Sequence, residues 1–173
     1  ITLEWDYYET KCIGISDRDL WSALGKIGPI YYSIDELLPL YPLKKQAFAN
    51  FCAETELILP SLKQQLMALE GYKMAVVTSS GRTEIEPILQ RENVLGLMGT
   101  AVYGNEVKAL KPDPEPYRTA MERLGATRAI AFEDSRAGIA SATAAGCEVV
   151  VVRHASELPE LLRSVTRLNP PSR

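Results

Sequence analysis

Short apolar runs alternate with helical patterns along the chain beyond residue 60. Four runs are short and apolar, as strands buried in a parallel sheet are, and they fall at residues 73–78, 101–103, 129–132 and 148–152. Helical patterns fall at residues 61–70, 83–92, 116–124, 135–145 and 157–166. Strands that alternate with helices form a parallel sheet covered on both faces. We therefore expect an α/β fold with a Rossmann-like parallel sheet core.

The first part of the chain has a helical pattern without strands. Ser33 precedes Glu36 in the spacing of a capping box, so a short helix should begin there. Pro39 and Pro42 are expected to separate the short helices from a further helix that starts near Lys44. We therefore expect residues 1–53 to form a small helical domain and residues 54–173 to form the α/β core.

Two adjacent carboxylates, Glu133 and Asp134, follow the apolar run at residues 129–132. Open parallel sheets bind ligands outside the carboxyl ends of their strands, so the pair lies where chemistry is expected. Two neighbouring carboxylates cannot both lose water cheaply without a cation or a proton between them, and such oxygen ligands suit Mg²⁺. The alternative is an acidic helix start that favours the helix dipole, with Ser135 or Asp134 as the cap.

A turn with hydroxyl groups follows the apolar run at residues 73–78. Thr78 and Ser79 offer O–H and backbone N–H donors at a strand end before a helix, and such a turn can bind a phosphate. Serine and glycine are also ordinary turn residues. This segment alone therefore leaves both interpretations open.

A third segment, K-P-D-P-E-P-Y at residues 111–117, holds Lys111 beside three prolines. The prolines exclude helix before Pro116, which suits a first helical position, and they keep Lys111 on an ordered loop where its ammonium can neutralise charge. A solvated surface lysine is the alternative. Together the three segments supply hydroxyl and amide donors, a cation and metal-binding carboxylates, which are the groups that phosphoryl transfer requires.

These segments resemble the second, third and fourth motifs of the haloacid dehalogenase-like superfamily of phosphohydrolases. The matching stretches are V-V-T-S-S-G-R, K-P-D-P-E-P-Y and F-E-D-S-R-A-G-I-A-S-A-T-A-A-G. The chain is most similar to the subgroup with a helical cap, which includes phosphoglycolate phosphatases and β-phosphoglucomutases, and the resemblance runs from about Tyr7 to Val152. It implies that the N-terminal helices form the cap and that the substrate is a small phosphorylated metabolite.

The resemblance also implies a role for each residue at a matching position. Thr78 would donate a hydrogen bond to a phosphoryl oxygen, and Ser79 would help through its backbone. Lys111 would balance the charge of the phosphoryl group. Glu133 and Asp134 would hold Mg²⁺.

The family's first motif, D-x-D after an apolar strand, is absent from this sequence. In the family its first aspartate is the nucleophile, and its strand lies at the centre of the sheet, between the strands expected at residues 73–78 and 129–132. Without it those two strands would face a gap, where each buried backbone group without a partner costs about 1–3 kcal/mol. We therefore expect a strand and at least one cap helix to precede Ile1 in the parent protein. A direct pairing of the two strands would refute this.

The resemblance implies a Mg²⁺-dependent phosphatase that acts through an aspartyl phosphate, with the nucleophile upstream of Ile1. The missing first motif supports an alternative, a catalytically inactive fragment or interaction module that keeps only a phosphate-binding cleft. A β-phosphoglucomutase is a third possibility, although in that group an arginine follows the cap's G-x-S, whereas here Asp17 follows residues 14–16. A haloacid dehalogenase has no use for a metal, and a response-regulator receiver has its acidic pair first and its lysine last.

Charge and composition limit the classes of binding partner and the cellular compartment that we expect. A net charge of −3 argues against nonspecific binding to nucleic acid. No apolar run is long enough to span a membrane, no signal peptide is visible, and three cysteines without metal or redox spacing suit a reducing compartment, so we expect a cytoplasmic protein.

Arg18, Lys44 and Lys45 are candidates for binding an anionic end of the substrate, with solvated surface as the alternative. His154, the only histidine, is expected in a loop.

Overall fold

The chain divides into two compact units, Ile1–Thr55 and Glu56–Arg173. The computed structural model describes residues 4–8, 12, 17–27, 30–69 and 71–168. No helix in these ranges combines the length and apolarity needed to cross a membrane. Residues 14–16, the G-x-S segment that was compared with the cap of β-phosphoglucomutases, lie outside the described ranges.

The first unit is helical in its described part. Its helices are α1 (Trp5–Tyr7), α2 (Asp17–Leu24), α3 (Ile34–Leu37), the 3₁₀ helix η2 (Leu38–Leu40) and α4 (Tyr41–Glu54). Helix α3 begins where the capping pattern predicts, because the Glu36 carboxylate accepts hydrogen bonds from the N–H and the hydroxyl of Ser33, each at 2.8 Å. The prediction for Pro42 was wrong: this proline lies in the first turn of α4, where its missing N–H would have had no partner within the helix.

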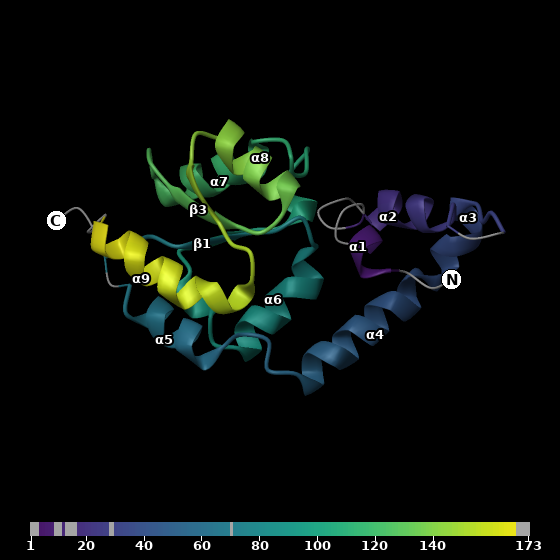
Figure 1. Ribbon diagram of the computed structural model, residues 1–173, viewed down its shortest axis with the longest axis horizontal. Coiled ribbons are helices and arrows are strands. Elements are labelled where there is room, and N and C mark those ends of the chain that lie inside the picture. The colour runs from purple at the N-terminus through teal and green to yellow at the C-terminus, as the bar shows by residue number, and fades with distance from the viewer. Residues whose placement is uncertain (1–3, 9–11, 13–16, 28–29, 70, 169–173) are drawn as a thin grey trace. The chain divides into compact units, whose positions relative to one another are not determined.

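The second unit is an α/β fold, as the alternation of patterns predicts. Its elements in chain order are α5 (Pro60–Met67), β1 (Ala75–Val77), α6 (Arg82–Arg91), η3 (Leu95–Leu97), β2 (Thr100–Val102), η4 (Gly104–Glu106), α7 (Glu115–Leu124), β3 (Ile130–Glu133), α8 (Arg136–Ala144), β4 (Glu148–Val151), η5 (Ala155–Glu157) and α9 (Leu158–Leu168). Helices α7 and α8 lie on one side of the strands, and α5, α6 and α9 lie on the other (Figure 1). The strands are therefore covered on both faces, as apolar parallel strands require.

The described strands form two parallel pairs, β1 with β2 and β3 with β4. The Gly99 N–H donates to Met74 O at 2.8 Å and the Thr78 N–H donates to Val102 O at 3.0 Å, so the residues that flank β1 face β2. Because backbone direction alternates along a strand, the N–H and C=O of Val77 face the opposite, open edge. In the described residues β1 and β3 are not paired with each other, so the arrangement that would have refuted an intervening strand is not observed.

An apolar cluster connects the two strand pairs. Tyr117 of α7, Ala131 of β3 and Ala142 of α8 are buried at its centre, and Val77 of β1 packs against them. Helix α7 also packs on β1 and β2, and it touches α8. Burial of such side chains contributes roughly 1.5–3 kcal/mol for each large one, so this cluster stabilises the core across the open edges.

Glu92, at the end of α6, links α5 to α6 from a buried position with 5% exposure. Its carboxylate accepts hydrogen bonds from Lys63 of α5 at 2.6 Å and from the neighbouring Arg91 at 2.7 Å. The hydrogen bond from Lys63, followed by that from Arg91, lowers the pKa of Glu92 to about 2. The charged carboxylate therefore stabilises the folded state.

We expect this stabilisation to depend on pH in the acid range. Folding lowers the Glu92 pKa, so its contribution is complete above the ordinary value of 4.5 and is lost as the pH falls toward about 2. Glu92→Gln should lower the free energy of unfolding at pH 7, and its difference from the wild type should shrink between pH 4.5 and the acid limit. Urea denaturation across this range measures the difference. A difference that stays constant with pH would contradict the assignment.

Helix α8 approaches the end of β3 so closely that only glycine fits at position 138. Ser135 caps the helix by accepting the Gly138 N–H at 3.0 Å, and a Cβ on Gly138 would overlap the Glu133 carboxylate. Alanine in a helix is normally more stable than glycine by roughly 0.5–1 kcal/mol. Here the overlap should reverse that sign, because Glu133 is buried and has little room to move.

Gly138→Ala should therefore lower the free energy of unfolding by about 1–3 kcal/mol. Gly96→Ala is the matched control, since a Cβ there meets nothing within 4 Å. Chemical denaturation of both variants provides the measurement. Equal stabilities of the two variants would show that the α8 contact is not tight.

Candidate active site

Lys111 brings the ends of β1 and β3 together. Its Nζ donates a hydrogen bond to the Val77 carbonyl oxygen at 3.0 Å, and it forms an ion pair with Glu133 Oε1. The side chains of Lys111 and Glu133 are only 9% and 7% exposed. Lys111 thus lies in the interior, next to the strand-end segments that the sequence analysis identified, rather than on a solvated surface.

Glu133 has a second buried partner that sequence reasoning missed. The Tyr117 hydroxyl donates a hydrogen bond to Glu133 Oε1, the oxygen that also accepts from Lys111. The Lys111 ammonium lies 5.1 Å from the centre of the Tyr117 ring. Burial, followed by the hydrogen bond to Glu133, raises the pKa of Tyr117, so its hydroxyl stays protonated and acts as a donor. The available signal was its position on the first turn of the helix that follows Lys111.

The loop that carries Lys111 is held by side chains as well as by its prolines. The Glu115 carboxylate accepts the backbone N–H groups of Lys108 at 3.0 Å and Ala109 at 2.8 Å, and these bonds lower the pKa of Glu115. On the other side of Lys111, the Ser141 hydroxyl of α8 donates to the Asp113 carbonyl oxygen at 2.5 Å. The loop is therefore fixed on both sides of the lysine.

The turn after β1 carries the two predicted hydroxyl residues. Thr78 Oγ1 accepts the Ser80 N–H at 3.1 Å, so the hydrogen of the Thr78 hydroxyl stays available to another acceptor. Ser79 Oγ is buried and has no hydrogen-bond partner in the described part of the chain. An unsatisfied buried hydroxyl costs about 1–3 kcal/mol, which an anion at this turn would relieve.

Asp134 differs from its neighbour in exposure. Its side chain is exposed, and it makes no hydrogen bond or ion pair with a residue that the structure describes. Mg²⁺ commonly takes one or two carboxylates and completes its shell with water and phosphate oxygens, so Asp134 fits this cation. No group of three acidic, histidine or cysteine residues gathers within the described ranges. The magnesium role of Glu133 stays a prediction, and in the structure Lys111 and Tyr117 share its Oε1.

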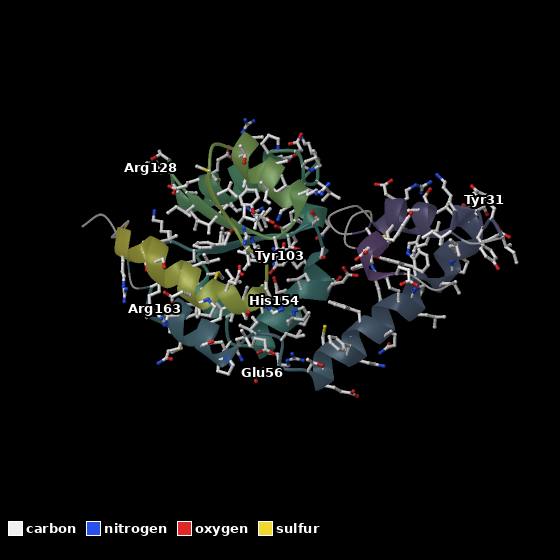
Figure 2. All side chains as sticks on the ribbon, in the orientation of Figure 1. Tyr31, Glu56, Tyr103, Arg128, His154 and Arg163 are labelled. Atoms are coloured by element: carbon white, nitrogen blue, oxygen red, sulfur yellow. The ribbon has the colours of Figure 1, made fainter. Side chains whose placement is uncertain are left out.

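The remaining residues singled out in the sequence lie outside the strand-end segments. Arg18 is exposed on α2, and the ammonium groups of Lys44 and Lys45 lie 5.6 and 4.8 Å from the centre of the Tyr41 ring. Their substrate role stays a prediction. His154 lies in a loop as expected, where its Nδ1 accepts the Ser156 N–H at 3.3 Å at the start of η5 (Figure 2).

Removal of either member of the buried ion pair should leave the other charge uncompensated. We expect Lys111→Met to lower the free energy of unfolding by about 3–5 kcal/mol. Glu133→Gln on that background should restore part of the loss, because it removes the unpaired carboxylate. A double-mutant cycle in urea measures this coupling, and strictly additive effects would show that the two side chains do not interact.

Sequence comparison reveals known relatives. A profile for the haloacid dehalogenase-like hydrolase family matches residues 5–152. The chain is 32% identical over 143 residues to a phosphorylated carbohydrates phosphatase of Thermotoga maritima, a match that covers 80% of this chain and 64% of that protein. It is 34% identical over 101 residues to a plasmid-encoded phosphoglycolate phosphatase of Cupriavidus necator, a match that covers 56% of this chain and 44% of that protein. The chain thus spans between 44% and 64% of the length of these two curated relatives.

Solved structures share the fold. A β-phosphoglucomutase from Clostridium difficile matches with a TM-score of 0.75 at 19% identity, covering 96% of this chain and 85% of that one. CbbY from Rhodobacter sphaeroides, solved in complex with phosphate, matches with a TM-score of 0.71 at 21% identity. This match covers 87% of this chain and 71% of that one. At these identities the likeness concerns the fold alone. With the family profile extending over most of the chain and the Thermotoga relative covering 80% of it, this chain belongs to the haloacid dehalogenase-like hydrolase family.

Proposed function

We propose that the protein is a Mg²⁺-dependent phosphatase that hydrolyses phosphate esters of small metabolites through an aspartyl-phosphate intermediate. Membership in the hydrolase family supports the reaction class. The names of the two relatives, a phosphorylated carbohydrates phosphatase and a phosphoglycolate phosphatase, support a small phosphorylated metabolite as the substrate.

The position of Lys111 carries the proposal. Its ammonium contacts the carbonyl of Val77, the residue before Thr78, and the carboxylate of Glu133, the residue before Asp134. The hydroxyl turn, the cation and the carboxylates therefore meet at one edge of the strands, although they are far apart in sequence. A phosphoryl-transfer site requires donors, a cation and carboxylates to converge in this way.

Donors for the phosphoryl oxygens remain available at this edge. Lys111 Nζ carries three hydrogens, of which Val77 and Glu133 take two. The hydroxyl hydrogen of Thr78 and the backbone N–H of Ser79 have no acceptor among the described residues. We assign these donors to the equatorial oxygens of the transferred group, whose negative charge they would stabilise in the transition state.

The carboxylates of Glu133 and Asp134 would have different roles. We assign Asp134 as the Mg²⁺ ligand, because its oxygens have no protein partner in the described part of the chain. Glu133 adjoins it and has a positioning task, because its Oε1 accepts from Lys111 and Tyr117 while its Oε2 accepts the Ser135 hydroxyl at 3.4 Å. When bound, Mg²⁺ would neutralise charge on the phosphoryl oxygens and orient the group for in-line attack.

A second candidate function follows from the aspartates. Between residues 56 and 173 the sequence contains only Asp113 and Asp134, and neither belongs to a D-x-D motif. Asp113 Oδ1 accepts the Glu115 N–H at 2.9 Å, which is a structural role at the start of α7. A protein without a nucleophilic aspartate would bind phosphorylated metabolites without hydrolysing them, and this is the alternative function.

Asp134→Ala should reduce Mg²⁺-dependent hydrolysis of a generic aryl phosphate by more than about 100-fold, because the assigned metal ligand is removed. The assay uses protein made from the complete reading frame, with and without Mg²⁺. Glu122→Ala, which removes an exposed carboxylate from the last turn of α7, is the control and should change the rate by less than about twofold. Undiminished turnover by Asp134→Ala would discard the assignment. A wild-type protein that binds phosphate but hydrolyses no ester would favour the second candidate.

A further inference from the structure

The 3₁₀ helix η4, which follows β2, holds the turn of the proposed phosphate site in place. The Gly104 N–H donates to the Ser80 carbonyl oxygen at 2.9 Å. The Asn105 amide oxygen accepts the Arg82 N–H, the first N–H of α6, at 3.0 Å. A Cβ on Gly104 would overlap the Ser79 carbonyl oxygen, so the two segments are in close contact.

Side chains beneath this contact fix η4 itself. Arg82 Nε donates to Glu106 Oε1 at 3.1 Å, and Arg123 of α7 donates to the other Glu106 oxygen at 3.0 Å. Burial acts to raise the pKa of Glu106, but the hydrogen bonds from Arg82 and Arg123 outweigh it and lower the pKa, so the carboxylate stays charged. The Arg82 guanidinium lies 4.7 Å from the centre of the ring of Tyr103, a residue in the interior with 0% exposure (Figure 2).

These contacts decide which donors of the turn remain for a ligand. The Ser80 N–H is taken by Thr78 Oγ1, and the Arg82 N–H is taken by Asn105. The N–H groups of Ser79 and Gly81 make no hydrogen bond with any residue in the described ranges, and Ser79 Oγ also lacks a partner there. The free donors thus flank Ser80, whose own carbonyl oxygen is held by η4.

We propose that Asn105 is a positioning residue for phosphate binding at the Thr78–Gly81 turn, an inference that rests on the proposed function. By holding the first N–H of α6, Asn105 sets where the helix begins and therefore where the Ser79 and Gly81 N–H groups point. Without it, the Arg82 N–H would lose its acceptor and the start of the helix could shift. Asn105 itself does not need to touch the ligand.

The test compares two ligands on the full chain. Asn105→Ala should weaken binding of inorganic phosphate by about tenfold, as loss of a supporting hydrogen bond typically does at a binding site. The Mg²⁺ dissociation constant, measured separately without phosphate, should change by less than about twofold because Asp134 lies on a different segment. Isothermal titration calorimetry gives both constants. If Asn105 had a merely structural role, the substitution would change both dissociation constants or neither. Either of those results would overturn the proposal.

Two further variants sharpen the result. Asn50→Ala removes an amide oxygen that accepts a comparable hydrogen bond, from Gln46 at 2.8 Å, in the other unit, and should leave phosphate binding unchanged. Asn105→Asp keeps an oxygen acceptor for the Arg82 N–H but adds a negative charge. Because position 105 is exposed, phosphate binding is compared at high ionic strength, which screens that charge, and should stay within about threefold of the wild type. If Asn105→Ala does not fold, a tenfold loss in Asn105→Asp would overturn the inference.

Failure of the inference and failure of the proposed function are distinguishable. A wild-type protein that binds no phosphate with Mg²⁺ present would overturn the proposed function and this inference with it. A wild-type protein that binds phosphate, together with an Asn105→Ala variant that binds equally well, would overturn the role of Asn105 alone.

Discussion

The buried ion pair between Lys111 and Glu133 is the interaction on which the arrangement of the core depends. Among the described residues β1 pairs only with β2, and β3 pairs only with β4, so no hydrogen-bonded ladder connects the two pairs. Lys111 spans them at their carboxyl ends by contacting both Val77 and Glu133. A charged group in the interior is tolerated only when it is paired and hydrogen-bonded, so the two side chains constrain each other's position.

Helix α7 gives this pair its surroundings. Its first residue, Glu115, binds two backbone N–H groups of the loop that leads to Lys111, and Tyr117 on the same turn donates to Glu133. The segment K-P-D-P-E-P-Y therefore places the lysine, holds its loop and orients its partner. The prolines explain the order of this loop only in part, because the carboxylate of Glu115 and the hydroxyl of Ser141 are also needed.

Strand geometry explains why two adjacent carboxylates behave differently. Glu133 is the last residue of β3, and successive side chains of a strand point to opposite sides. Glu133 accordingly turns inward to Lys111 while Asp134 is exposed. The alternation leaves one carboxylate for the protein and one for solvent or a ligand.

The sequence alone determined the alternation of strands and helices, the capping of α3 by Ser33, and the three segments that carry candidate chemistry. For the cap of α8 it left Ser135 and Asp134 open, and the structure has Ser135 there. These features depend on neighbours within a few residues, where periodicity, proline and capping groups act directly. The start of α4 was misjudged because Pro42 can also stand in a first helical turn. Only the tertiary structure decided that Lys111 pairs with Glu133, that Tyr117 joins them and that Asn105 holds α6. Those contacts join residues 16 to 23 positions apart, and the path of the folded chain, which local patterns do not encode, brings them together.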